Sequence, residues 1–295
     1  MKNILILGKT GMLGSMLYYY FSNLEDYRVF STSREETDKL KLQFDALKND
    51  ISELSEFIIK NKIEYILNAI GIINVHCRDK DMEGTKKAIL INSYFPFQLS
   101  QVAKETSAKV IQIATDCVYD GKDGNYNEDS FQNPIDVYGK TKSLGEVGDK
   151  SILNIRCSII GPEKKTKLSI LEWFLNSPKE TQLKGFVHHK WNGVTTLRFA
   201  KLMHRIIEKN LFNSLLEKSH IYHYVPKYSL NKYEMLVLFN KVFNKSFQIS
   251  PTDSIGVPIN RTLSTKFSDL DEFSDIDFEK DLIELKEVRK NNYEN

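Results

Sequence analysis

The first 157 residues alternate short apolar runs with longer amphipathic stretches. The apolar runs, each four to seven residues long, lie at 3–7, 27–31, 41–44, 64–70, 109–114 and 152–157. The amphipathic stretches between them have the length of helices and lie at 12–24, 50–61, 84–106 and 137–148. Runs this apolar are typical of parallel strands that helices bury on both faces. The sequence therefore predicts an α/β fold, a doubly wound parallel sheet whose ligands bind at the carboxyl ends of the strands.

Beyond residue 162 the alternation is less regular. Helical patterns lie at 168–176, 194–209, 229–244 and 280–288, and strand-like runs at 183–188, 221–225 and 247–250. No low-complexity linker separates the two parts of the sequence. We therefore predict a sheet domain at 1–162 with returning segments at 194–226. A smaller α/β lobe, mainly at 163–295, is predicted to be interleaved with it.

The charge balance and the cysteine pattern exclude several classes of protein. Lys and Arg total 41 against 39 Asp and Glu, a formal net charge of +2, whereas nucleic-acid binders carry a marked basic excess. No run of about 18 apolar residues is present that could span a membrane. The three cysteines, Cys77, Cys117 and Cys157, form no CxxC pair, and the six histidines form no HExxH motif. We therefore predict a cytoplasmic protein with reduced thiols, no metal site, no nucleic-acid partner and no membrane association.

A glycine motif follows the first predicted strand and opens the first predicted helix. Gly8, Gly11 and Gly14 stand in the sequence G-K-T-G-M-L-G. In this context glycines permit a tight turn, close approach of backbone N–H groups to a pyrophosphate, and close packing of helix on strand. A nucleotide-triphosphate loop would need a further glycine where Asn3 stands, so that alternative fails. The remaining alternative is a glycine-rich turn without a ligand.

The end of the second predicted strand indicates which dinucleotide is bound. NAD-binding folds usually carry an acid there that holds the ribose 2′-hydroxyl. Here the sequence is Ser31-Thr32-Ser33-Arg34, without a carboxylate. A guanidinium is well suited to the 2′-phosphate of NADP, so we predict NADPH as the cofactor, with NADH as the alternative. Arg34 could instead be a solvated surface residue.

Tyr138 and Lys142 are four residues apart in a predicted helix, which places them on one face. A phenol has an unperturbed pKa of about 10. A neighbouring ammonium favours the phenolate, so we expect Lys142 to lower the pKa of Tyr138 towards neutrality. Thr115 ends the strand-like run 109–114, at the predicted ligand-binding edge, where its hydroxyl could polarise a substrate carbonyl. A tyrosine and a lysine at this spacing form only a weak signal in a lysine-rich chain.

Four motifs in order along the chain are similar to those of extended short-chain dehydrogenases/reductases. They are the glycine loop, Asn68-Ala69-Ile70-Gly71, Thr115-Asp116 and Tyr138-x-x-x-Lys142. The finer pattern resembles the dTDP-4-dehydrorhamnose reductase branch, in T-G-M-L-G at 10–14, A-T-D-C-V-Y-D-G at 114–121 and Y-G-K-T-K-x-x-G-E at 138–146. The resemblance implies that 1–162 is an NADP-binding Rossmann domain and that the interleaved lobe binds substrate. It continues less closely through Arg156, the 191–196 stretch and Arg261.

The resemblance also implies roles for individual residues. The catalytic set would be Thr115, Tyr138 and Lys142, with Asn92 supporting the lysine. Cofactor binding would fall to Gly8, Thr10, Gly11, Met12, Leu13, Gly14, Ser33, Arg34, Asp45, Ala46, Asn68, Ala69, Gly71, Tyr138 and Lys142. Substrate binding would fall to Asp116, Cys117, Trp191, Asn192 and Arg261, the last on a diphosphate, which suits bidentate guanidinium geometry.

The implied activity is the NADPH-dependent reduction of a nucleotide-linked 4-keto-6-deoxyhexose, for synthesis of surface-polysaccharide precursors by a homodimer. Three positions depart from the family pattern where it bears on the sugar and the nucleotide: Cys117 in a position that is often aromatic, the unusual stretch 71–82, and Thr262 in place of a proline. Cys117 could equally be a small core residue. The alternatives are an epimerase or dehydratase with bound NAD, and a non-catalytic regulatory subunit on the same fold.

Overall fold

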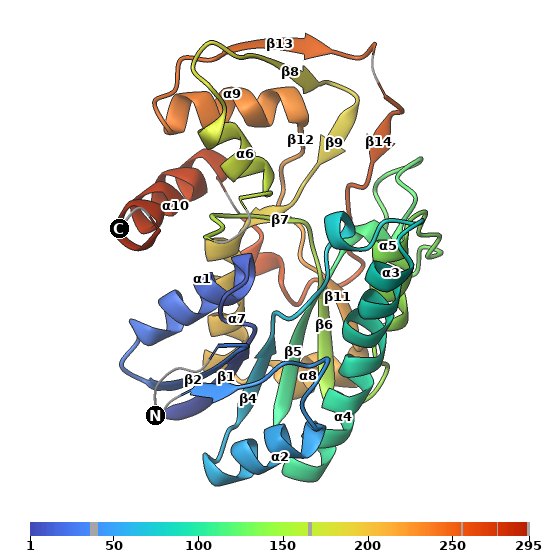
Figure 1. Ribbon diagram of the computed structural model, residues 1–295, viewed down its shortest axis with the longest axis vertical. Coiled ribbons are helices and arrows are strands. Elements are labelled where there is room, and N and C mark those ends of the chain that lie inside the picture. The colour runs from blue at the N-terminus through green and yellow to red at the C-terminus, as the bar shows by residue number, and fades with distance from the viewer. Residues whose placement is uncertain (36–40, 165–166, 255, 276, 294–295) are drawn as a thin grey trace. The chain divides into compact units, whose positions relative to one another are not determined.

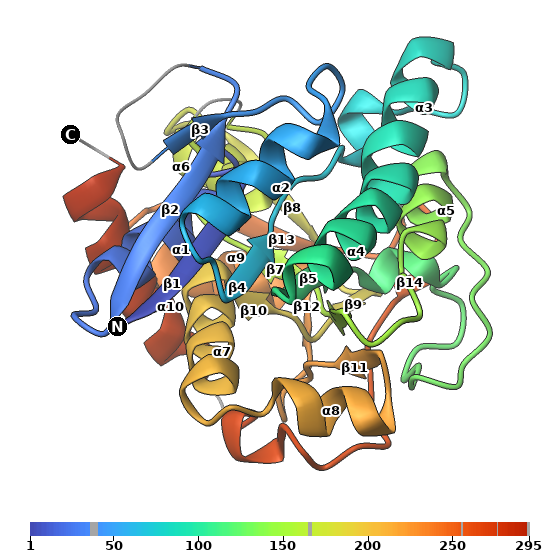
Figure 2. The ribbon, with the colours of Figure 1, turned by 90° about the horizontal axis from the view of Figure 1, so that it is seen from below.

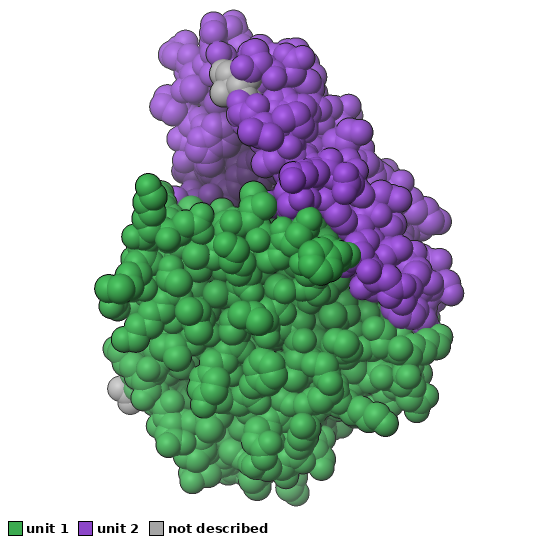
Figure 3. Space-filling view, turned by 90° about the vertical axis from the view of Figure 1, so that its right-hand side faces the viewer, with its two compact units in different colours: residues 1–119, 131–156, 200–222 green, residues 120–130, 157–199, 223–295 purple. Residues whose placement is uncertain are grey.

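The computed structural model describes residues 1–35, 41–164, 167–254, 256–275 and 277–293. The chain divides into two compact units, each built from three separate stretches (Figure 3). Unit 1 comprises Met1–Tyr119, Phe131–Arg156 and Ala200–Tyr222, and unit 2 comprises Asp120–Ser130, Cys157–Phe199 and His223–Asn295. The second stretch of unit 1 ends at Arg156, whereas the sequence predicts a boundary at 162. Its returning segment is 200–222 rather than 194–226, and 120–130 leaves it for unit 2.

Among the described residues, seven strands form one sheet in the order β11-β6-β5-β4-β1-β2-β3 (Figure 1). Their bounds are β1 Lys2–Leu7, β2 Tyr27–Ser33, β3 Lys41–Gln43, β4 Tyr65–Asn68, β5 Lys109–Ala114, β6 Ile152–Arg156 and β11 Ile221–His223. Each neighbouring pair from β6 to β3 is parallel. The chain order reverses between β1 and β4, which is where a doubly wound sheet binds its ligands. The predicted fold class is confirmed.

Helices cover both faces of this sheet (Figure 2). Their bounds are α1 Met12–Ser22, α2 Ile51–Lys60, α3 Met82–Ala88, α4 Phe95–Thr106, α5 Val137–Leu144, α7 Thr196–Glu208 and α8 Phe212–Lys218. On one face, Leu54 of α2 and Leu99 of α4 belong to the same buried core as Leu5, Ile66 and Val110 of the strands. Helices α1 and α7 lie on the opposite face. This packing makes the strands apolar on both sides, as their sequences predict.

The predicted helix at 84–106 is interrupted. Helix α3 passes into a π-helical segment, η2 (Ile89–Tyr94), before α4 begins at Phe95. A π-helical turn admits an extra residue and so rotates the side chains that follow it, and such turns are frequent at functional sites. Asn92 lies within this segment and is buried. Sequence periodicity does not register the interruption, because both flanking helices keep their apolar faces.

Unit 2 is built from short strands and three helices in the described residues. Its elements are β7 Ile159–Ile160, α6 Ile170–Asn176, β8 Gln182–Phe186, β9 His189–Trp191, β10 Val194–Thr195, β12 Leu230–Asn231, α9 Lys232–Val242, β13 Gln248–Thr252, β14 Ile259–Asn260 and α10 Phe278–Asn292. The strands pair as β10-β7, β12-β9-β14 and β13-β8. Two buried carboxylates hold helices in place, Asp281 by an ion pair with Arg198 and Glu172 by one with Arg289.

Several short elements of the structure differ from the sequence prediction. The predicted helix at 194–209 begins only at Thr196, because Val194 and Thr195 pair with β7 as a strand. The strands β7, β9, β12 and β14 have two or three residues each, too few for a periodic pattern to show. Within the described ranges, no helix is long and apolar enough to cross a membrane.

Candidate active site

The glycine loop lies at the carboxyl end of β1 and is tied to the end of β2. Gly8 has φ +79°, a left-handed conformation that favours glycine. Its N–H donates to the Thr32 hydroxyl at 3.1 Å, and the Lys9 N–H donates to the Thr32 carbonyl at 3.1 Å. A Cβ on Gly14 would lie 2.1 Å from the Gly8 carbonyl oxygen, so only glycine allows α1 to approach the loop this closely.

The loop fits a dinucleotide pyrophosphate. A Cβ on Gly11 would meet only the Gly8 carbonyl oxygen, at 3.5 Å, so the space above this position is open. Gly11 is also the N-cap of α1 and has no side chain to cap that end of the helix, whose first turn contains no acidic residue. Unpaired N–H groups at a helix N-terminus attract anions. The predicted neighbours Thr10, Met12 and Leu13 lie in this loop and the first turn of α1.

The end of β2 presents the residues that the sequence assigns to the adenosine half of the cofactor. Ser31, Thr32 and Ser33 are buried, whereas Arg34 is exposed. The Ser33 hydroxyl donates to the Glu35 carbonyl at 2.5 Å and so shapes this turn. Residues 36–40, which follow, lie outside the described part of the chain. The role of Arg34 and Ser33 in NADP binding stays a prediction.

Other predicted cofactor residues follow β3 and β4 at the same edge of the sheet. Asp45 and Ala46 follow β3 and are half-buried, and the Asp45 carboxylate accepts the Leu47 N–H at 3.0 Å. Asn68 ends β4 and is buried. Its amide donates to the Gln112 side chain at 2.8 Å and accepts the Ile70 N–H at 3.1 Å, which fixes the 69–71 turn. All these positions lie at strand ends, as the predicted site requires, but their contacts to a cofactor stay predictions.

The predicted catalytic residues come together in unit 1. Asp136 caps α5 by accepting the Gly139 N–H at 2.7 Å, and this helix carries Tyr138 and Lys142. The side chain of Thr115, directly after β5, forms a hydrogen bond with the Tyr138 phenol. The Lys142 ammonium donates to the Ile113 carbonyl of β5 at 2.9 Å. The site therefore joins the end of β5 to one face of α5.

Asn92 is held in place by three hydrogen bonds. Its amide nitrogen donates to the Ile72 carbonyl at 2.9 Å and to the Thr141 hydroxyl at 3.1 Å. Its amide oxygen accepts the Ile72 N–H at 2.8 Å. These contacts connect the π-helical segment both to the turn after β4 and to α5. Asn92 is thus built into the support of the site rather than exposed to a ligand, since its side chain is 2% accessible.

The pKa of Tyr138 differs from the sequence expectation. Burial raises the pKa of the phenol well above its usual value, and the nearby Cys117 and Asp116 side chains add to the rise. The hydrogen bond with Thr115 opposes it. The expected shift towards neutrality is therefore not seen, because desolvation of the phenolate outweighs the opposing effect of Thr115. Tyr138 therefore carries its proton at neutral pH, as a proton donor must.

Lys142 is buried, and burial lowers the pKa of its ammonium to about 8, with Glu146 acting in the opposite direction. At pH values between about 8 and the normal lysine pKa of about 10.4, the unfolded chain therefore carries this proton more often than the folded chain does. Stability should rise with pH across that window, and the cost of the buried charge is fully present below pH 8. The site thus keeps a buried positive charge on the helix that carries the tyrosine.

Replacement of Lys142 by methionine should therefore stabilise the protein at pH 7. We expect a gain of about 2 kcal/mol, allowing for the hydrogen bond lost to the Ile113 carbonyl. The gain should shrink towards pH 10, where the wild-type lysine is neutral in the folded state. Urea unfolding of both proteins at the two pH values measures it. A Lys142→Met variant less stable than wild type at pH 7 would contradict the buried-charge interpretation.

The predicted substrate residues fall in two groups. Asp116 and Cys117 lie next to Thr115, whose hydroxyl donates to the Asp116 carboxylate and accepts the Cys117 N–H, both at 3.2 Å. Both side chains are half-buried. In unit 2, Trp191 is buried and donates to the Ser158 hydroxyl at 2.9 Å. Substrate binding by Asp116, Cys117 and Trp191 stays a prediction.

Asn192 and Arg261 also belong to unit 2. The Asn192 side-chain amide donates to the Leu263 carbonyl at 2.7 Å and accepts the Leu263 N–H at 2.9 Å. Arg261 follows β14 and packs on Gly121, where a Cβ would lie 2.9 Å from the arginine Cγ. Asn192 therefore stabilises unit 2 itself, and binding of substrate by either residue stays a prediction.

Sequence patterns missed a buried ion pair beside the site. The carboxylate of Glu146, just after α5, pairs with Arg156 at the end of β6. An arginine inside the apolar run 152–157 was the available signal, because a charge in a buried strand requires a partner. Nothing in the sequence identifies which acid supplies it.

Residues 1–272 match the family described as the RmlD substrate binding domain. The chain belongs to this family. Among curated proteins it is 27% identical over 263 residues to methionine adenosyltransferase 2 subunit beta from Danio rerio, covering 82% of this chain and 74% of the relative. It is also 26% identical over 245 residues to dTDP-4-dehydrorhamnose reductase from Aggregatibacter actinomycetemcomitans, covering 80% of this chain and 78% of that one.

Solved structures share the fold of this RmlD-family protein at low sequence identity. The dTDP-4-dehydrorhamnose reductase of Bacillus anthracis in complex with NADP has a TM-score of 0.78 at 17% identity, covering 98% of this chain and 100% of that one. The dTDP-glucose 4,6-dehydratase of the same organism, in complex with NAD, has a TM-score of 0.75 at 15% identity, covering 99% and 97%. At the level of the family, the family match and the curated reductase support an NAD(P)-dependent oxidoreductase.

Proposed function

We propose that this protein reduces the keto group of a nucleotide-linked 4-keto-6-deoxyhexose with NADPH, in the synthesis of surface-polysaccharide precursors. The observation that carries the proposal is the arrangement of Thr115, Tyr138 and Lys142. A protonated phenol hydrogen-bonded to a hydroxyl, with a buried ammonium on the same helix face, is suited to protonating an oxygen that gains negative charge. A protein that only binds nucleotides has no need of it.

The residues would act in sequence on the substrate carbonyl. When bound, the nicotinamide supplies a hydride to the carbonyl carbon. The Thr115 hydroxyl polarises the carbonyl oxygen, and Tyr138 gives that oxygen its proton. The phenolate left on Tyr138 would then be stabilised by the positive charge of Lys142. The glycine loop would hold the pyrophosphate of the cofactor.

The proposal is tested by incubating the protein with NADPH and a panel of dTDP-, UDP- and GDP-linked 4-keto-6-deoxy sugars. Loss of NADPH absorbance with at least one member, in a stoichiometry of one NADPH per sugar reduced, is the expected result. The preferred nucleotide identifies the substrate. Consumption of no NADPH with any member would overturn the proposal.

The choice of NADPH over NADH is proposed to depend on Arg34. Replacing Arg34 with alanine removes a charge-assisted contact to the 2′-phosphate, which should weaken NADPH binding by roughly tenfold to a hundredfold and leave NADH binding unchanged. Calorimetric titration with both cofactors measures this. Arg28→Ala is the matched control, since Arg28 is an exposed arginine near the other end of β2. Equal effects of Arg34→Ala on both cofactors would contradict the assignment.

A second candidate is a non-catalytic subunit of another enzyme. It is favoured by the likeness to proteins named methionine adenosyltransferase 2 subunit beta. The two candidates differ in one measurable respect, because a subunit role survives loss of the tyrosine. If Tyr138→Phe leaves the biological effect of the protein intact and the panel gives no turnover, the subunit role is supported. An epimerase or dehydratase would instead convert a sugar nucleotide with no net consumption of cofactor.

A further inference from the structure

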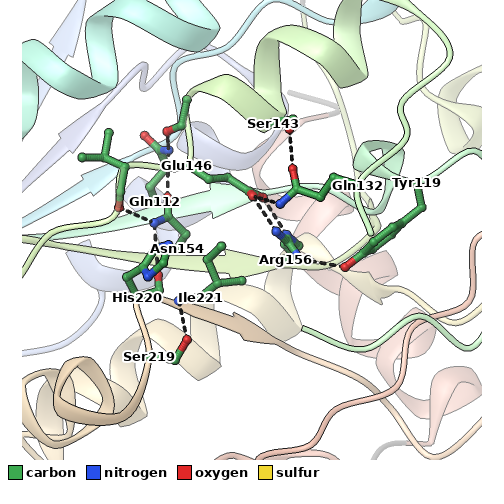
Figure 4. Close-up of polar contacts among 12 residues, drawn as sticks. Gln112, Tyr119, Gln132, Ser143, Glu146, Asn154, Arg156, Ser219, His220 and Ile221 are labelled. Carbon is green, nitrogen blue, oxygen red and sulfur yellow. Dashed lines mark hydrogen bonds and ion pairs between the residues drawn. The ribbon is translucent and has the colours of Figure 1, made fainter. Parts of the chain in front are cut away.

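A buried ion pair joins the end of α5 to the end of β6 (Figure 4). The Arg156 Nε donates to one oxygen of Glu146 at 2.7 Å, and its Nη2 donates to the other at 2.6 Å. The Arg156 side chain is 0% exposed and that of Glu146 is 2% exposed. Such a two-point contact fixes the orientation of both planar groups. Glu146 lies four residues after Lys142, so the pair holds the end of the helix segment that carries Tyr138 and Lys142.

The same guanidinium also holds the segment that carries Thr115. The Arg156 Nη1 donates to the Tyr119 hydroxyl at 2.7 Å, and the guanidinium carbon lies 5.5 Å from the centre of the Tyr119 ring. Tyr119 follows Thr115 by four residues, across the short helix η3 (Asp116–Val118). One side chain therefore contacts both chain segments that supply the reactive hydroxyls.

Further buried contacts restrain the same end of α5. The Gln132 amide donates to the Glu146 carboxylate at 3.1 Å, and the Gln112 amide donates to the Gly145 carbonyl at 2.9 Å (Figure 4). A Cβ on Gly145 would lie 1.8 Å from the Asn92 carbonyl oxygen, so the helix end also packs directly against the π-helical segment. The position of this end is thus set by β5, β6 and the segments around Gln132 and Asn92.

Stability alone does not account for the ion pair. A buried pair gives up the hydration of two charges, and well-packed apolar residues of the same size commonly serve stability as well or better. What apolar residues do not supply is a fixed, directional connection among three chain segments. We propose that Arg156 and Glu146 are positioning residues that set the distance between Thr115 and the Tyr138–Lys142 face of α5. The proposal rests on the proposed reductase function.

The test replaces both charges, so that no lone charge is left buried. The double variant Glu146→Met/Arg156→Leu should fold cooperatively, bind NADPH within about twofold of wild type and keep a similar KM. Its kcat should fall by about a hundredfold, the effect of moving a catalytic group by roughly 1 Å. If the pair had a structural role alone, the double variant would change in stability, but its kcat would not fall while its KM stayed the same. A kcat within threefold of wild type would overturn the proposal.

Two further variants sharpen the result. Glu172→Met/Arg289→Leu removes an equivalent pair between α6 and α10 in unit 2, and it should leave kcat unchanged. Arg156→Lys keeps the charge but cannot span both Glu146 oxygens and Tyr119, so it should not restore the wild-type kcat. If Glu172→Met/Arg289→Leu lost as much kcat as Glu146→Met/Arg156→Leu, the loss would be a general effect of removing a buried pair. That result would overturn the proposal.

A structural readout separates this proposal from the proposed function. If the wild type reduces no sugar of the panel, the proposed function fails, and crystal structures of wild type and Glu146→Met/Arg156→Leu with NADPH decide the positioning claim. We expect the contact of 2.9 Å between the Lys142 ammonium and the Ile113 carbonyl to be lost in the variant. Unchanged positions of Thr115, Tyr138 and Lys142 would overturn it.

Discussion

Replacing Tyr138 with phenylalanine should lower kcat for sugar reduction by about a thousandfold or more, within the range that general acids contribute. The ring and its packing remain, so the fold should be unaffected. The proton that neutralises the new alkoxide is lost, and only water remains to supply it. NADPH affinity should stay within about tenfold of wild type, because the phenol would contribute at most one hydrogen bond to that complex. Steady-state kinetics and calorimetric titration give the two numbers.

Tyr222→Phe is the matched control for this variant. Tyr222 is a buried tyrosine of the same unit whose hydroxyl donates to the Leu215 carbonyl at 2.9 Å, away from the proposed catalytic set. Its removal should lower stability by about 1 kcal/mol and leave kcat unchanged. If Tyr138→Phe retains more than about a tenth of wild-type kcat, Tyr138 is not the proton donor.

Alanine at Gly14 and at Gly11 should differ in their effect on stability, although the two glycines are three residues apart in one loop. A Cβ on Gly14 would lie 2.1 Å from the Gly8 carbonyl oxygen and 2.7 Å from the Gly8 carbonyl carbon. Backbone cannot yield to it, so Gly14→Ala should destabilise the protein by about 1–3 kcal/mol and distort the loop. Because the loop is distorted, Gly14→Ala should also lose NADPH binding. Thermal and urea unfolding measure the first effect.

At Gly11 a Cβ meets only one atom, at 3.5 Å, and the φ of −81° suits alanine. Gly11→Ala should therefore fold with a stability within about 1 kcal/mol of wild type. It should nevertheless weaken NADPH binding by at least about tenfold, because the methyl group occupies space that the pyrophosphate needs. If Gly11→Ala binds NADPH normally, the loop does not cradle the cofactor at this point.

The sequence predicted the sheet domain well because its signals are local. The strands β1, β4, β5 and β6 each lie in a short apolar run, and burial on both faces is what makes such a run recognisable. The site residues at strand ends, such as Gly8, Asn68 and Thr115, follow from the same logic, since parallel strands end at one edge. The four-residue spacing of Tyr138 and Lys142 likewise needs only a helix to bring both to one face.

The remaining features depend on contacts between distant segments. The pKa of Tyr138 is raised by burial, which no spacing in the sequence reveals. The pairing of Arg156 with Glu146 and Tyr119 joins three segments whose order along the chain gives no clue to their contact. Short strands such as β7 and β10 exist because they pair with each other, not because two residues have a strand pattern.

In the proposed reaction a hydride passes from NADPH to C4 of the sugar. This transfer is tested most directly with NADPH carrying deuterium at the transferable position, followed by mass and NMR analysis of the sugar product. We expect one deuterium at C4 for each NADPH oxidised, and almost no product with Tyr138→Phe. A sugar product without deuterium, or conversion without NADPH oxidation, would contradict it.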